Sequence, residues 1–236
     1  MSKAVRNLLA VDPSLTASGW ALFSLTTGLP LIWGVIRSDS PRVSLAQRMA
    51  KFQAEVEQLF DEQRVDNRDA VVCEGPAPLV LNPQSALKVE GIRGIFETVA
   101  RSRGAVVPGR LNPRTVQSEL LGMKGSQLPR QQVKEIARQT AEQLFGENLR
   151  ALGENATIGR ASAVNVVKFS SKTHLSQDIV DALLIGAVAI SRLRFAASSG
   201  LPLEEAFAPR SRSRGFVGGG RRGTGWTEED VRKLRG

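Results

Sequence analysis

The chain alternates between short apolar runs and longer segments in which apolar residues recur every three or four positions. Several short runs contain Val, Ile, Phe or Trp, which is typical of buried strands. Turn residues such as Gly28 and Pro30 separate the first runs, and this favours an antiparallel meander. We expect five strands, over residues 7–11, 18–25, 31–36, 70–73 and 105–107.

The segments with helical spacing predict amphipathic helices, and the last of them is almost wholly apolar from residue 182 to 187. The predicted helices cover residues 44–63, 85–100, 113–121, 130–145 and 176–195. Three strands, a helix, a strand, a helix, a strand and then helices form an α/β order. We therefore expect an α/β fold with a five-stranded mixed sheet flanked by helices.

The length of 236 residues fits one domain with an added arm. Residues 146–172 show no clear period, so we interpret 146–177 as a long loop or an insertion. Residues 198–225 are rich in Gly, Ser, Pro and Arg and too poor in apolar residues to fold alone. The predicted organisation is a domain over 1–197 and a basic, flexible tail over 198–236.

The charge balance favours a polyanionic partner. The chain carries 32 Lys and Arg against 23 Asp and Glu, a net charge of +9. Within residues 209–236, eight basic residues stand against three acidic ones, so +5 of that charge belongs to the tail. Such an excess suits nucleic acid or an anionic membrane surface.

Several classes of protein are excluded. A single cysteine, Cys73, and a single histidine, His174, rule out a disulfide framework and a zinc site built from Cys and His. No apolar run is long enough to cross a bilayer, and no signal-peptide core precedes Asp12. We expect a cytoplasmic protein without a membrane partner.

Four acidic residues stand at the ends of predicted elements. Asp12 closes the first strand and Glu74 the fourth, while Asp178 and Asp181 share one face of the last helix. Acidic residues at such positions are commonly turn, cap or solvent-facing residues, but Asp181 leads directly into a buried helix. If the first and fourth strands are neighbours, the four carboxylates meet and repel one another unless cations intervene. Two Mg²⁺ ions would satisfy them and could support in-line phosphoryl displacement.

The same segments resemble a known family. Residues 8–21 (LLAVDPSLTASGWA) are similar to the opening strand and turn of the RuvC-type Holliday junction resolvases. Residues 71–74 (VVCE) resemble their second acidic motif, 85–94 (SALKVEGIRG) the helix that follows it, and 178–183 (DIVDAL) their final motif. The match runs from about residue 8 to 190, with all four acids in order.

The resemblance implies an RNase H-like fold and a homodimer that cuts two strands of a four-way DNA junction. It implies that Asp12, Glu74, Asp178 and Asp181 are catalytic and hold Mg²⁺, with Mn²⁺ a possible substitute, and that the products carry 5′-phosphate and 3′-hydroxyl ends. Two rival functions stay open. One is a broader nuclease for flaps and branched DNA on the same fold, and the other is a junction-binding protein without catalysis. A branch-migration partner is not identified.

Further residues are candidate DNA contacts. The family places basic residues beside its site, and the candidates here are Lys88, Arg114, Lys124 and Arg130. Leu79 and Leu81 could form an apolar wedge at the junction centre, or pack against the body. The stripe of Ile92, Phe96 and Val99 could be a dimer face or core, and His174 could take a phosphate or catalytic role.

Overall fold

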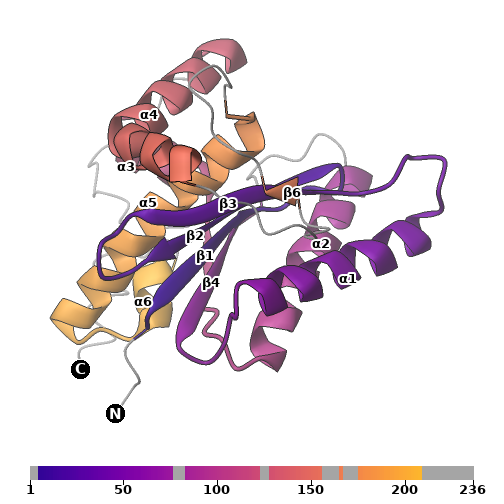
Figure 1. The fold of residues 1–236 in the computed structure, drawn as a ribbon, viewed down its shortest axis with the longest axis horizontal. Coiled ribbons are helices and arrows are strands. Elements are labelled where there is room, and N and C mark those ends of the chain that lie inside the picture. The colour runs from indigo at the N-terminus through magenta and orange to yellow at the C-terminus, as the bar shows by residue number, and fades with distance from the viewer. Residues whose placement is uncertain (1–4, 77–82, 123–127, 156–164, 167–174, 209–236) are drawn as a thin grey trace, which may run out of the picture.

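One mixed sheet forms the centre of the molecule (Figure 1). The computed structural model describes residues 5–76, 83–122, 128–155, 165–166 and 175–208. Within them the sheet has the order β5-β4-β1-β2-β3-β6. Its strands are β1 (Asn7–Asp12), β2 (Ala17–Ser24), β3 (Pro30–Arg37), β4 (Asp69–Glu74), β5 (Arg110–Leu111) and β6 (Asn165–Val166).

The predicted five-stranded mixed sheet is confirmed, with one addition and one shift. β1, β2 and β3 form the expected antiparallel meander, and β4 lies parallel to β1. The two-residue β6 adds a sixth strand, antiparallel to β3. The fifth strand was predicted over 105–107, but β5 starts at Arg110, and Val106 forms only an isolated bridge to Ala70.

Helices cover both faces of the sheet, which is why its strands are apolar without alternation. Leu9 and Val11 of β1 face one buried cluster, and Leu8 and Ala10 face the other. The helices are α1 (Leu45–Glu62) and α2 (Pro83–Ser102) on the first side, and α3 (Pro113–Leu120), α4 (Arg130–Asn155), α5 (Gln177–Ser199) and α6 (Leu203–Phe207) on the other (Figure 1).

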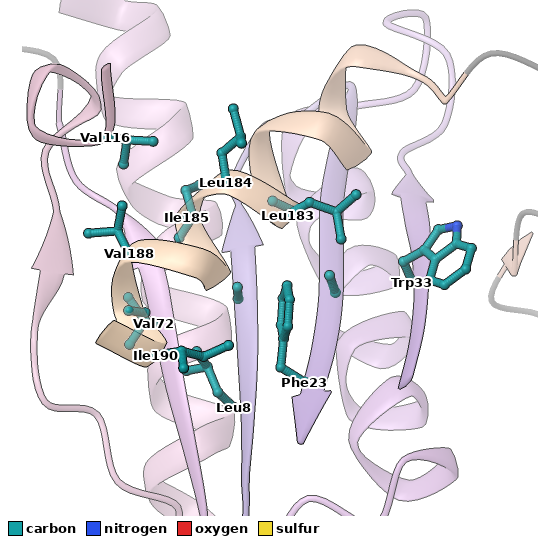
Figure 2. Close-up of a cluster of buried hydrophobic side chains, with 14 of the residues drawn as sticks. Leu8, Phe23, Trp33, Val72, Val116, Leu183, Leu184, Ile185, Val188 and Ile190 are labelled. Carbon is teal, nitrogen blue, oxygen red and sulfur yellow. The ribbon is translucent and has the colours of Figure 1, made fainter. Parts of the chain in front are cut away.

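The second cluster centres on α5, whose apolar side chains enter the sheet closely. Figure 2 shows Phe23 of β2 beside α5, below Leu183. A Cβ atom at Gly186 would lie 2.1 Å from the Phe23 ring, so glycine at this position allows the helix to sit against the strand. α5 is therefore pressed against β1 and β2, and its first turn reaches the end of the sheet where β1 stops.

Two predicted boundaries are wrong. The helix expected to end at residue 145 continues to Asn155, because Leu149 extends the buried row of Ala141 and Phe145, so residues 146–155 are not loop. The tail predicted from residue 198 begins too early, because α5 runs to Ser199 and α6 follows with Phe207 buried. The apolar residues of these segments were too sparse to show a helical period.

The stripe on α2 belongs to the core. Ile92, Phe96 and Val99 are buried in the cluster shared with α1, where the rings of Phe52 and Phe96 meet edge to face at 5.8 Å. These residues therefore do not offer a dimer face. No helix in the described part of the chain is long and apolar enough to cross a membrane.

Candidate functional site

Two of the four predicted acids meet where neighbouring strands end. β1 and β4 are parallel, and their register pairs Val11 with Cys73, so the next residues, Asp12 and Glu74, lie side by side. The two carboxyl groups share a hydrogen bond. The condition on which the sequence prediction depended, that the first and fourth strands are neighbours, is met.

α5 brings the other two acids to the same place. Gly19 of β2 lies opposite Asp12 in the antiparallel register. A Cβ atom on Gly19 would lie 1.9 Å from the backbone carbonyl oxygen of Asp178, a distance that no side chain tolerates. The missing side chain therefore lets the first turn of α5 approach the strand, and Asp178 and Asp181 arrive beside Asp12.

The pKa values of three of these acids reflect the burial and the neighbouring charges. Burial raises the pKa of Asp12 well above its usual value, and the charges of Glu74, Asp181 and Asp178 raise it further. Burial and the charge of Asp181 raise the pKa of Glu74 to about 7, against a lowering effect of Arg93. Burial also raises the pKa of Asp181. Buried carboxylates without sufficient counter-charge are costly to ionise, and a bound cation would remove that cost.

The donor set suits a hard divalent cation, since all four side chains offer carboxylate oxygens. As they stand, however, no three acidic, imidazole or thiol groups among the described residues are arranged to hold a metal ion. Asp12 is hydrogen bonded to Glu74, and Asp181 accepts a hydrogen bond of 2.9 Å from the Gln177 amide. Rotation of these side chains away from their present partners would be needed to turn their oxygens toward a common ion.

A partly buried network of arginines and glutamates, not anticipated from the sequence, supports Glu74. The side chain of Arg93 on α2 is only 3% exposed, and its Nε donates to the backbone carbonyl of Glu74 at 2.6 Å. Arg93 also contacts Glu90, which accepts from Arg110 at 2.8 Å, and Arg110 donates to Glu97 at 2.6 Å. The spacing of Glu90, Arg93 and Glu97 along one helix could have indicated this network from the sequence.

The predicted basic residues that the structure describes are exposed, and two further basic residues act on the acidic site. Lys88 on α2, Arg114 on α3 and Arg130 at the start of α4 are exposed, and within the described residues their side chains form no hydrogen bond or ion pair. Lys134 and Arg138 of α4 were missed, although their charges act on Asp181. Arg130, Lys134 and Arg138 are each four residues apart, and this spacing could have indicated a row of basic side chains along α4. The remaining candidates, Lys124, Leu79, Leu81 and His174, lie outside the described residues.

Comparison with known proteins identifies the fold. No family model and no curated protein matches the sequence. Among solved structures, the chain has the fold of RuvC-type resolvases, an RNase H-like α/β fold. Thermus thermophilus RuvC in complex with its Holliday junction substrate is 18% identical, with a TM-score of 0.55 over 82% of this chain and 96% of that one. A second structure of the Thermus protein gives a TM-score of 0.53 at the same identity and coverage.

A eukaryotic protein shares the fold as well. The yeast mitochondrial Holliday junction resolvase Ydc2 is 12% identical, with a TM-score of 0.51 over 84% of this chain and 86% of that one. The similarity spans most of each chain, so the predicted RNase H-like fold is confirmed. At such identities it establishes the fold alone, and the activity has to be argued from the site.

Proposed function

We propose that this protein is a Mg²⁺-dependent endonuclease that resolves four-way DNA junctions. The observation that carries the proposal is the convergence of Asp12, Glu74 and the Asp178/Asp181 pair from three separate elements onto one end of the sheet. The fold shared with RuvC-type resolvases supports the same activity. Acids that repel one another destabilise a fold that has no use for them, so their gathering at one point favours a functional role.

Each acid has its own support in the chain. Asp12 and Glu74 are held by paired strands, and Arg93 donates a hydrogen bond to the backbone carbonyl of Glu74. Asp178 and Asp181 are carried by a helix packed against β1 and β2. These four side chains would hold Mg²⁺, or Mn²⁺ in its place, most simply as two ions. When bound, such ions activate a water molecule and stabilise the leaving oxygen of the phosphodiester.

The substrate is inferred from charge and symmetry. Lys88, Arg114 and Arg130, which are exposed and unpaired among the described residues, would neutralise DNA phosphates, since an acidic centre alone would repel DNA. A four-way junction has two-fold symmetry, so a homodimer would present two sites to opposite strands. The products would be paired nicks with 5′-phosphate and 3′-hydroxyl ends.

Cleavage of synthetic DNA tests this function. The purified protein is incubated with a labelled four-way junction, a flap, a fork and a linear duplex, with Mg²⁺, Mn²⁺ or EDTA. We expect symmetrical paired nicks in the four-way junction alone, only with a divalent ion, and none from the Asp178→Asn variant. Comparable cutting of flaps and forks would favour the broader nuclease, whereas tight junction binding without cleavage would favour a non-catalytic binding protein.

A further inference from the structure

Two arginines are buried in the described part of the chain, and only one of them has an acidic partner there. Arg93, described above, is 3% exposed and pairs with Glu90. Arg48, near the start of α1, is 8% exposed, and its Nη2 donates to the hydroxyl of Ser38 at 2.7 Å. Arg48 forms no ion pair with any described residue. A buried charge without a counter-charge is costly, so the guanidinium of Arg48 is suited to receive an anion.

Most of the hydrogen-bonding capacity of Arg48 is unused. A guanidinium has five N–H donors, and the contact with Ser38 uses one of them. The Nε atom is enclosed by the protein and has no partner, whereas Nη1 has no partner among the described residues but is not enclosed. The Ser38 hydroxyl is neutral and donates to the backbone carbonyl of Asp39 at 3.3 Å, so it does not balance the charge. Nη1 and the remaining N–H of Nη2 are free to bind phosphate oxygens.

The charges in the segment that leads from β3 into α1 do not neutralise Arg48 either. Asp39 is the one acid in residues 37–48, and it pairs with Lys51 at 2.5 Å. Arg37 and Arg42 are exposed, and their side chains form no hydrogen bond or ion pair among the described residues. This segment therefore carries three cations against one acid, and that acid is already paired.

The end of β3 places the segment at the same edge of the sheet as the acidic site, but two strands away. Gly19 of β2 lies opposite Asp12 of β1 and Val35 of β3. β3 therefore continues two residues past the level of Asp12, as far as Arg37. Neighbouring strands are about 4.8 Å apart, so β3 lies about 10 Å from β1. Arg48 reaches this edge from α1, on the face of the sheet opposite to α5.

We infer that Arg48 binds a backbone phosphate of the DNA at the β3 edge of the sheet, away from the phosphate that is cleaved. The inference rests on the proposed function, because that function brings a DNA strand to this edge. Phosphates of one strand follow every 3.4 Å along the axis of B-form DNA, so about 10 Å corresponds to about three nucleotides. A phosphate contact carries no sequence information, and it fixes the position of the strand on the protein.

Junction binding in EDTA tests Arg48 without cleavage. Affinity for a synthetic four-way junction is measured across a range of salt concentrations for the wild type, Arg48→Met and Ser38→Ala. One lost phosphate contact reduces the slope of log K against log salt by about 0.9, so Arg48→Met should lose about that much and roughly tenfold in affinity. Ser38→Ala keeps the charge and should keep the slope. Equal losses in both variants would mean that Arg48 serves only to hold Ser38, and would overturn the inference.

Thermal melts without DNA provide a second measurement. Met keeps most of the apolar stem of arginine and removes a buried charge that has no counter-charge, so Arg48→Met should melt at or above the wild-type midpoint. Failure of this variant to fold would contradict the inference, because it would show that the protein itself satisfies Arg48. Arg68→Gln is the matched control for loss of charge. Arg68 pairs with Asp66 at the other end of the sheet, so its slope should equal that of the wild type.

The outcomes separate this inference from the proposed function. Cleavage by the wild type with an unchanged slope in Arg48→Met would overturn the inference and leave the proposed function standing, even if inorganic phosphate raised the wild-type midpoint. A reduced slope in Arg48→Met without cleavage by the wild type would support the phosphate contact and overturn the nuclease. Absence of junction binding by the wild type would overturn both.

Discussion

The two ends of the β1–β4 strand pair differ in how their acidic side chains are paired. At the beginning of β4, Asp69 is 1% exposed, and its oxygens accept hydrogen bonds from Arg6 at 2.9 Å and Asn7 at 3.1 Å. At the other end, Asp12 and Glu74 are hydrogen bonded to each other, and burial together with the charge of Asp181 raises both pKa values. The same two strands thus hold one acid that stabilises the fold and two that weaken it, and the unsatisfied end is the one suited to bind a cation.

Exchanging one acid for its amide at each end separates the two roles. Asp12→Asn should lower cleavage roughly a thousandfold, because a metal ligand contributes several kcal/mol to the transition state. The same change removes like-charge repulsion, so the thermal midpoint should stay equal or rise. Asp69→Asn should leave cleavage nearly intact and lower the free energy of unfolding by about 2 kcal/mol, since it weakens charge-assisted hydrogen bonds. Cleavage kinetics and thermal melts of both variants test these expectations. A lower thermal midpoint for Asp12→Asn would contradict the view that Asp12 destabilises the fold.

A substitution at Gly19 should move α5 away from the acidic end of the strand pair. Gly19→Ala puts a methyl group 1.9 Å from the Asp178 carbonyl oxygen, so the first turn of α5 must move away. A displacement of about 1 Å in a positioned group can cost roughly a hundredfold in rate, and we expect a loss of that order. Gly94→Ala on α2 is the control, because a Cβ there meets nothing within 4 Å, and it should keep full activity. Equal activity of both variants would show that Gly19 does not set the approach of α5.

The pH dependence of stability should also differ between the two ends. The pKa of Glu74 in the folded chain is about 7, above the 4.5 of an unperturbed glutamate. A carboxyl with a raised pKa favours the folded state when protonated, so stability should fall as pH rises through the range from about 4.5 to 7. The loss is of the order of 3 kcal/mol for such a shift. Asp66, at the other end, should have the opposite effect on stability. Arg68 lowers the pKa of Asp66 to about 2, so the stabilisation from its ionised carboxyl is lost only in acid.

Thermal melts in EDTA between pH 5 and 8 measure this loss. Adding Mg²⁺ should raise the midpoint at pH 8 and much less at pH 5, since protonated carboxyls do not bind metal. The Asp12→Asn variant should show a smaller response to both pH and metal. A thermal midpoint that rises steadily from pH 5 to 8 without metal would contradict the expectation that ionisation of these acids destabilises the fold.

Much of the fold followed from local pattern. Runs of apolar residues predicted the meander and β4, because a strand buried on both faces has to be apolar throughout. The period of α4 was predicted only to residue 145, since Leu149 and Leu152 are the only large apolar residues in the polar stretch that follows. The basic residues Lys134 and Arg138 were missed for a related reason: their side of α4 is decided by where the helix packs, and not by their neighbours in sequence.

The amino-acid sequence by itself determined the kinds of element, the four acids at their ends and the excess of positive charge, because each depends on residues close together in the chain. Only the tertiary structure decided that β1 and β4 are neighbours, that Gly19 admits α5, and that Arg93 supports Glu74. These arrangements join residues far apart in sequence, and they exist only once the strands have paired and the helix has packed against them.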